Sequence, residues 1–148
     1  MRMLYKQLEE LKPAYSKSFR LVFRHYPLTS IHENALDAAR AAEAAGIQGR
    51  FWEMHNQLYK NQSKWSKDPK ARQIFSEYAR SLGLDLARFT RDIDSLQANT
   101  RIRQDTERGN SLGVTGTPTV FLNGRELTLD AAEDLPKALN AALAGTGR

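Results

Sequence analysis

The stretch that decides the fold is Leu112-Gly113-Val114-Thr115-Gly116-Thr117-Pro118-Thr119-Val120-Phe121-Leu122-Asn123-Gly124-Arg125-Glu126-Leu127. Residues 119–122 are β-branched, aromatic or aliphatic, a composition that favours a strand. Asn123-Gly124 suits a two-residue type I′ turn, because both residues tolerate a positive φ. Residues 125–127 then return as a second strand. The stretch therefore predicts a β-hairpin.

Pro118 directly precedes the first strand of this hairpin. A proline at that position, with Thr117 before it and glycines at Gly113 and Gly116, is typical of a cis-proline turn. The alternative is an ordinary turn with a trans proline.

The rest of the chain is predicted to be mainly helical, apart from a strand over residues 19–26 that ends at Pro27. The last helix ends around Ala144-Gly145. The expected helix signals are, in chain order, Leu4, Leu8 and Leu11 before a stop near Pro13; a capping box of Ser30 and Glu33 before a stop at Gly46; a run over about 49–59; Asp68-Pro69 before a stop at Leu82-Gly83; an Asp85 cap; a polar run over about 95–112; and a cap of Asp130 with Glu133.

The composition is that of a folded globular protein, and the order of the expected elements indicates an α/β domain with helix predominating. The 148 residues are 41% hydrophobic and 26% charged, which is too apolar for a disordered chain. The net charge is +5, but basic and acidic residues are interleaved, so we expect no nucleic-acid partner. No run approaches the length of a membrane span, and no membrane partner is expected. We expect a single domain over 1–148, with a helical insertion over about 30–112.

Three stretches, in this order and with helices between them, resemble the DsbA-like branch of the thioredoxin superfamily. The resemblance covers nearly the whole chain and implies a thioredoxin-like fold with a helical insertion. The parent activity that it implies is thiol–disulfide exchange on protein substrates. The three stretches are Arg20-Leu21-Val22-Phe23-Arg24-His25-Tyr26-Pro27-Leu28 with Ile31-His32-Glu33-Asn34-Ala35; Gln48-Gly49-Arg50-Phe51-Trp52-Glu53-Met54-His55; and residues 112–119 with Asn123-Gly124.

The resemblance also supplies the substrate-binding residues. In the family the proline faces the redox cysteines, and the residue before it offers backbone hydrogen bonds to an extended substrate. Carried over, Thr117 and Pro118 line a groove for an extended peptide or protein substrate. No catalytic residue, metal ligand or cofactor is assigned.

The main departure from the family is the redox motif. The family places a strand and a Cys-x-x-Cys motif just before its first long helix, where the helix N-terminus lowers a thiol pKa. Here that position falls before Met1, and the sequence contains no cysteine. We therefore expect a fold without its first strand and a redox-inactive chain, either shortened or naturally altered. The family suggests a periplasmic or extracytoplasmic location for the full-length parent.

Two other functions remain open. One is a redox-dead peptide-binding or scaffold module that works through the Pro118 loop. The other is a glutathione-dependent isomerase-like protein of the same fold, which needs a serine or cysteine near the N-terminus.

The absent first strand has a consequence for assembly. It would lie between residues 21–23 and 120–122, and burying four to six apolar side chains there is worth on the order of 10 kcal/mol at about 1.5–3 kcal/mol each. Uncovered strand edges recruit partners, so we expect a homodimer or an exchanged oligomer.

Two other groups of residues are interpreted as structural. The histidines His25, His32 and His55 lack the helical i, i+4 spacing of a metal pair. The aromatic residues have spacings that suit a helical core better than a ligand site; they are Phe51, Trp52, Tyr59, Trp65, Phe75 and Tyr78.

Overall fold

The structure is a computed structural model that describes residues 19–128 and 135–145. The chain forms two compact units, one over 24–113 and one made of residues 1–23 and 114–148. The first is called here the helical unit. The expected helix near Leu4 and the Asp130 cap lie outside the described residues.

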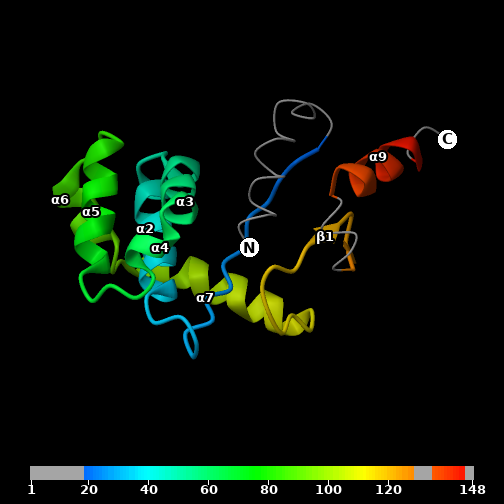
Figure 1. Cartoon of the computed structure of the whole chain (residues 1–148), viewed down its shortest axis with the longest axis horizontal. Coiled ribbons are helices and arrows are strands. Elements are labelled where there is room, and N and C mark those ends of the chain that lie inside the picture. The colour runs from blue at the N-terminus through cyan, green and yellow to red at the C-terminus, as the bar shows by residue number, and fades with distance from the viewer. Residues whose placement is uncertain (1–18, 129–134, 146–148) are drawn as a thin grey trace. The chain divides into compact units, whose positions relative to one another are not determined.

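The helical unit is built around α2 (Figure 1). This helix contacts α3, α5, α6 and α7, and all six of its buried residues are alanines. Small side chains allow neighbouring helix axes to approach closely. The helices of the unit are α2 (Ala35–Ile47), α3 (Phe51–Lys60), α4 (Gln62–Trp65), α5 (Ala71–Ser81), α6 (Leu86–Asp92) and α7 (Leu96–Ser111).

Large side chains on the other helices fill the space around the alanines. Phe75 and Met54 are fully buried, and Trp65 is 7% exposed. The Trp65 indole also donates a hydrogen bond from Nε1 to the carbonyl of Leu58, at 2.9 Å. Phe51 and Tyr78 pack against this cluster. The predicted core role of these aromatic residues is confirmed.

Two helix starts agree with the expectations from sequence, namely the Asp85 cap and the helix expected from about residue 95. The Asp85 carboxylate accepts a hydrogen bond from the Arg88 backbone N–H at 3.0 Å and caps α6. The Ser95 hydroxyl accepts one from the Ala98 N–H at 3.2 Å and caps α7. Each bond satisfies an N–H that has no partner within its helix.

The predicted capping box of Ser30 and Glu33 does not form, because α2 begins only at Ala35. The backbone N–H of His32 donates instead to the Leu28 carbonyl, so residues 28–32 make a turn. Asn34, the residue before the helix, donates from Nδ2 to the carbonyls of Trp65 and Asp68, at 2.8 and 2.9 Å. A contact with a distant part of the chain therefore sets this boundary.

Two further boundaries differ by one or two residues. The helix α2 continues past the predicted stop at Gly46 to Ile47, and Gly49 has the left-handed φ of 76°. The helix α5 begins at Ala71 rather than at Pro69. Asp68 still acts locally, since its carboxylate accepts from the Lys70 N–H at 2.7 Å.

The predicted strand over residues 19–26 is not a strand in the structure. Leu21 and Phe23 are half-buried while Arg20 and Val22 are exposed, so the predicted alternation is present. A strand also requires a ladder of backbone hydrogen bonds, and the ladder found in residues 19–128 and 135–145 contains only β1 and β2.

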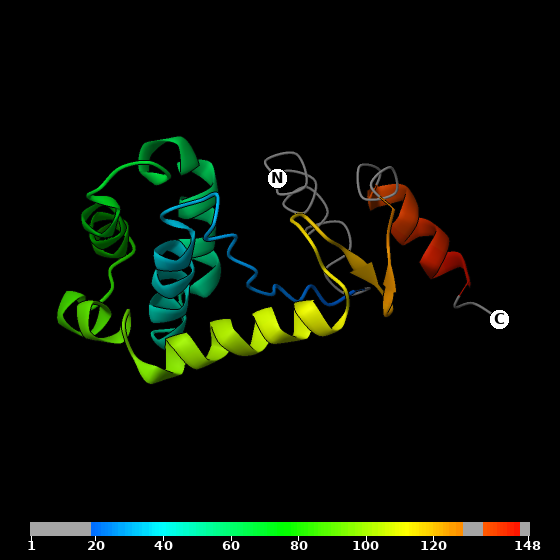
Figure 2. The ribbon, with the colours of Figure 1, turned by 90° about the horizontal axis from the view of Figure 1, so that it is seen from below.

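The second unit, called here the hairpin unit, contains β1 (Phe121–Leu122), β2 (Arg125–Glu126) and α9 (Leu135–Gly145) (Figure 2). The strands are antiparallel, with Phe121 opposite Glu126 and Leu122 opposite Arg125. Asn123 and Gly124 have φ values of 49° and 80°. Two successive positive φ angles are the mark of a type I′ turn, so the predicted hairpin is confirmed.

Leu135 and Leu139 of α9 are buried beneath the hairpin. Phe19, Val120, Leu122 and Leu127 pack against them. Side chains of a strand alternate between faces, so Val120 and Leu122 point towards α9 while Phe121 lies on the other face. No helix within the described residues is long and apolar enough to cross a membrane.

Candidate functional site

The predicted site residues lie in the loop that leads into β1. The peptide bond between Thr117 and Pro118 is cis. Both residues are half-buried, whereas Thr115 is exposed. The hydroxyl of Thr119 donates to the carbonyl of Gly116 at 2.8 Å and closes the turn around the proline.

The outer edge of β1 continues from this loop. The backbone N–H of Leu127 donates to the Val120 carbonyl at 2.8 Å, so Val120 faces β2. In an antiparallel pair, successive residues direct their backbone groups to opposite sides. The N–H and carbonyl of Phe121 therefore point away from β2, towards the outer edge of the strand.

Thr117 adds further backbone groups at the same end of the strand. Across residues 19–128 and 135–145, its backbone N–H and carbonyl form no backbone hydrogen bond. Thr117 and Phe121 together present backbone hydrogen-bond donors and acceptors, which are not reactive groups. Such an edge binds an extended segment by main-chain hydrogen bonds.

The hairpin unit holds this edge in place through its core. Leu135 and Leu139 are 4% and 5% exposed beneath the strands. The side chain of Phe121, on the opposite face, is 37% exposed. The site is thus a half-buried turn and a strand edge that no described residue covers with backbone hydrogen bonds, backed by a small apolar cluster.

The helical unit contains a buried acid that sequence reasoning missed. Asp105 of α7 is 2% exposed. Its carboxylate accepts from the backbone N–H of His25 at 3.1 Å and from Arg24 Nη1 at 2.8 Å. The spacing of Ala98, Ile102 and Asp105, all buried on one side of α7, is the signal that could have found it.

His25 makes a second buried contact, with α2. Its Nε2 lies 2.8 Å from Oε1 of Glu43, and its side chain is 5% exposed. Its ring also stands edge-on to Phe51, with centroids 5.9 Å apart. Asp105 and Glu43 thus fasten the segment at residues 24–25, where the helical unit begins, to α7 and α2.

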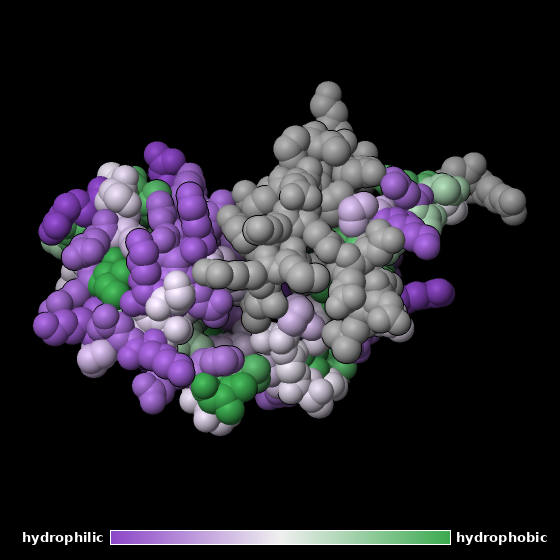
Figure 3. Space-filling view, viewed as in Figure 1, coloured by the Kyte–Doolittle hydropathy of each residue, from purple (hydrophilic) through white to green (hydrophobic). Residues whose placement is uncertain are grey.

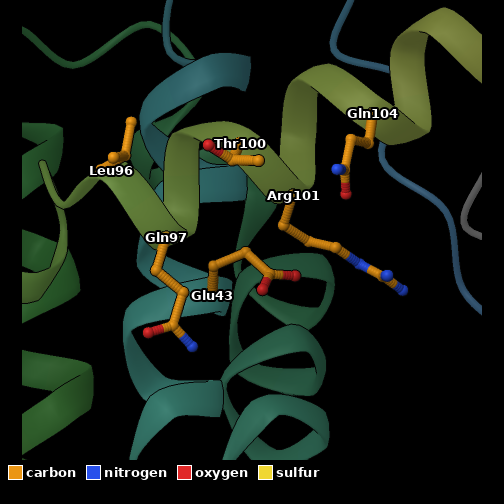
Figure 4. A pocket seen from close by; sticks show the side chains of 6 residues that line it. All are labelled: Glu43, Leu96, Gln97, Thr100, Arg101 and Gln104. Atoms are coloured by element: carbon orange, nitrogen blue, oxygen red, sulfur yellow. The ribbon is translucent and has the colours of Figure 1, made fainter.

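A shallow hollow of about 620 Å³ lies beside Glu43, between α2 and α7 (Figure 4). The side chains of Glu43 and Arg101 extend to the same side of it. Its other lining residues are Leu96, Gln97, Thr100 and Gln104. The Glu43 carboxylate is already paired with His25, and the glutamine amides are not reactive. The hollow is therefore a polar surface without a reactive group.

A charged network on the surface joins α2, α5 and the turn before α7. Arg72 donates to Asp37 at 2.8 Å and to Asp94 at 2.7 Å. These hydrogen bonds lower the pKa of Asp37, against an opposing effect of burial. The same guanidinium lowers the pKa of Asp94, and the two acids raise the pKa of Arg72. The network holds helices together and contains no nucleophile.

The three histidines lie in different environments. His25 is paired with Glu43, His32 is exposed, and His55 packs among the rings of Phe51, Trp52 and Tyr59. Within the described ranges, no group of three or more histidine, aspartate or glutamate side chains is placed to hold a metal ion.

The sequence matches known proteins along most of its length. The model of the family described as "DSBA-like thioredoxin domain" matches residues 1–142. Na(+)/H(+) antiporter NhaA 3 of Salinispora tropica is 44% identical over 108 residues, which is 73% of this chain and 16% of that protein. Na(+)/H(+) antiporter NhaA 1 of Salinispora arenicola is 41% identical over 130 residues, 87% of this chain and 19% of that protein.

A third relative is Na(+)/H(+) antiporter NhaA of Herminiimonas arsenicoxydans, 34% identical over 119 residues, 80% of this chain and 18% of that protein. The chain therefore spans less than a fifth of the length of these relatives. No solved structure matches the chain. The family match covers both units, with their helical insertion and hairpin, and these 148 residues carry no cysteine. The chain belongs to the DSBA-like thioredoxin domain family, with a thioredoxin-like fold.

Proposed function

We propose that this chain is a peptide-binding domain that uses the Thr117–Pro118 loop and the outer edge of β1, and that its own residues perform no thiol–disulfide exchange. The observation that carries the proposal is that, among residues 19–128 and 135–145, the backbone of Thr117 and the outward backbone groups of Phe121 form no backbone hydrogen bond. Thiol exchange requires a thiolate, and these 148 residues contain none. Main-chain recognition requires no thiol.

The chemistry of the edge defines the ligand. Backbone donors and acceptors at alternate residues pair with an extended segment, one strand spacing away. Phe121, half-exposed on the face away from α9, offers an apolar contact to such a segment. The ligand is therefore an extended, partly apolar stretch of polypeptide.

The test is a titration of 15N-labelled protein with short unstructured peptides, each also prepared with N-methyl groups at alternate positions. Shifts are expected in the amides of Thr117, Thr119 and Phe121, and N-methylation in one register should abolish them. Thr117→Pro, which removes one N–H, should weaken binding, while Thr115→Ala should not. Shifts confined to the helical unit would contradict the proposal.

The same titration separates the glutathione alternative. Reduced glutathione in place of a peptide should produce no saturable shift at Thr117 or Phe121. Saturable binding of glutathione, together with no binding of peptides, would favour the isomerase-like function.

A second candidate concerns the biological partner. The matched relatives are named as Na(+)/H(+) antiporters, and each matches this chain over a fraction of its own length. This observation favours a domain that works beside, or joined to, an antiporter. The test is Na(+)/H(+) exchange by a purified relative in vesicles, measured with its matching segment deleted and with this chain added back. Unchanged exchange in both cases would contradict the association.

A further inference from the structure

The lysines of the helical unit lie in one short segment of the sequence, whereas its arginines are spread along the unit. All four lie between residues 60 and 70, where Asp68 is the one acidic residue. We call Lys60, Lys64, Lys67 and Lys70 the lysine face. Each of the four is exposed. Residues 24–113 contain fourteen basic and eleven acidic side chains. The excess of positive over negative charges in residues 60–70 therefore equals that of the whole unit.

The four lysines lie on two short successive helices and the turn that follows them. Lys60 is the last residue of α3, Lys64 lies in α4, and Lys67 and Lys70 lie in the turn between α4 and α5. Leu58 of α3 and Trp65 of α4 are buried, whereas the lysines around them are exposed. The Trp65 indole bond to the Leu58 carbonyl fixes the two short helices together.

Within the described residues, no ion pair neutralises the charge of this face. Seven arginines of the unit have a carboxylate within ion-pair distance, among them Arg24, Arg40 and Arg72. In the part of the chain that the structure describes, no ion pair involves Lys60, Lys64, Lys67 or Lys70. The carboxylate of Asp68 is instead bonded to the backbone N–H of Lys70. This short segment is thus an exception to the interleaved charges of the rest of the unit.

An exposed apolar side chain belongs to the same end of the unit. Ile31 is 68% exposed. Its turn is tied to this end by Asn34, which bonds the carbonyls of Trp65 and Asp68. Figure 3 shows that side chains of the helical unit on the face in view are largely hydrophilic, with separate apolar spots. An exposed apolar side chain in a turn that is bound to the lysine segment fits an interface of charged headgroups above acyl chains.

We propose that the lysine face, with Ile31, binds the surface of a membrane that contains anionic phospholipid. Lysine ammonium groups act as point charges towards lipid phosphates, and each one near such a surface contributes about 1 kcal/mol. A nucleic acid fits less well, because base recognition uses exposed aromatic rings and arginine forks. The aromatic residue of this segment, Trp65, is buried.

The experiment is co-sedimentation of the full chain with vesicles of phosphatidylcholine, with and without phosphatidylglycerol. Binding is expected only with phosphatidylglycerol and should fall as salt is raised. The triple variant Lys60→Gln, Lys64→Gln, Lys67→Gln should bind about 100-fold more weakly, from roughly 1 kcal/mol per lysine. The variant Ile31→Ser should lose less, about fivefold, as expected for one partly inserted side chain.

The matched control removes the same charge elsewhere. Arg80→Gln, Arg88→Gln, Arg108→Gln changes three exposed residues on α5, α6 and α7 and should retain binding within a few-fold. Equal losses in both triple variants would show a response to net charge alone and overturn the proposal. Equal binding to both kinds of vesicle, or binding to duplex DNA but to no vesicle, would also overturn it. Circular dichroism of both variants verifies that the helices are intact.

Discussion

Asp105 offers the sharpest test of how the helical unit is held together. The change is Asp105→Ala, which removes a carboxylate that is 2% exposed. Two hydrogen bonds are lost, the one from the His25 backbone N–H and the one from Arg24, together with a longer ion pair to Arg101 at 3.6 Å. These losses differ in size, because His25 is buried, whereas Arg24 and Arg101 are 46% and 45% exposed.

The magnitude follows from these environments. A buried N–H that loses its acceptor costs about 1–3 kcal/mol. An ion pair with a half-exposed arginine contributes less than about 1 kcal/mol after solvent screening. Asp105→Ala should therefore lower the free energy of unfolding by about 1–4 kcal/mol. Asp105→Asn keeps an oxygen for the His25 N–H and should cost about half as much.

The assay is urea unfolding followed by tryptophan fluorescence. Trp52 and Trp65 both lie in the helical unit, so the signal reports on that unit. The control is Glu107→Ala on the same helix, which removes an exposed i, i+4 pair with Arg103 and should cost about 0.5 kcal/mol or less. Equal midpoints for Asp105→Ala and Glu107→Ala would refute the reasoning.

Three further predictions concern other parts of the structure. Arg72 lowers the pKa of Asp37 and Asp94, so the stability that it contributes is full at neutral pH and is lost as pH falls below about 4. The unfolding free energies of wild type and Arg72→Gln should therefore converge in acid. A constant difference between them in urea titrations from neutral to acid pH would contradict this. Gly124→Val should destabilise the hairpin by about 1–2 kcal/mol, since φ is 80° there, and hydrogen exchange of the Leu127 amide should quicken; unchanged protection would show that the turn is not needed. The homodimer stays a prediction, supported by the open outer edge of β1, and light scattering checks it: a monomer at high protein concentration would rule against edge pairing.

Features set by neighbouring residues were the ones that could be predicted from the sequence. Asp85 and Ser95 cap their helices through bonds three residues away. The hairpin turn likewise depends on two adjacent residues, Asn123 and Gly124. Such features need no knowledge of the rest of the chain.

Features set by distant residues could not be predicted in this way. Ser30 and Glu33 have the pattern of a capping box, but Asn34 is bound to carbonyls at Trp65 and Asp68 and fixes the helix start. Residues 19–26 have the alternating burial of a strand. A strand also needs a backbone hydrogen-bond partner, and the local sequence does not show whether one is present. Asp105 was overlooked because hydrophobic periodicity counts only apolar residues on a buried face.

The sequence proposes a position for the candidate site but not its extent. Thr117 and Pro118 were identified by resemblance, and the structure places both in the turn that leads into β1. The open backbone of Phe121 was not identified. The register of β1 against β2 decides which side of the strand is open, and the register follows from the paired positions.

The alanine face of α2 bears on how this domain can change through mutation. Ala41, Ala44 and Ala45 have no exposed surface, and helices lie against α2 on several sides. A larger side chain at one of these positions has to displace a neighbouring helix. The same substitution at an exposed position of an outer helix extends into solvent. Sequence drift and engineering libraries alike should therefore spare these alanines and spread over the periphery, which makes α2 the most constrained element of the helical unit.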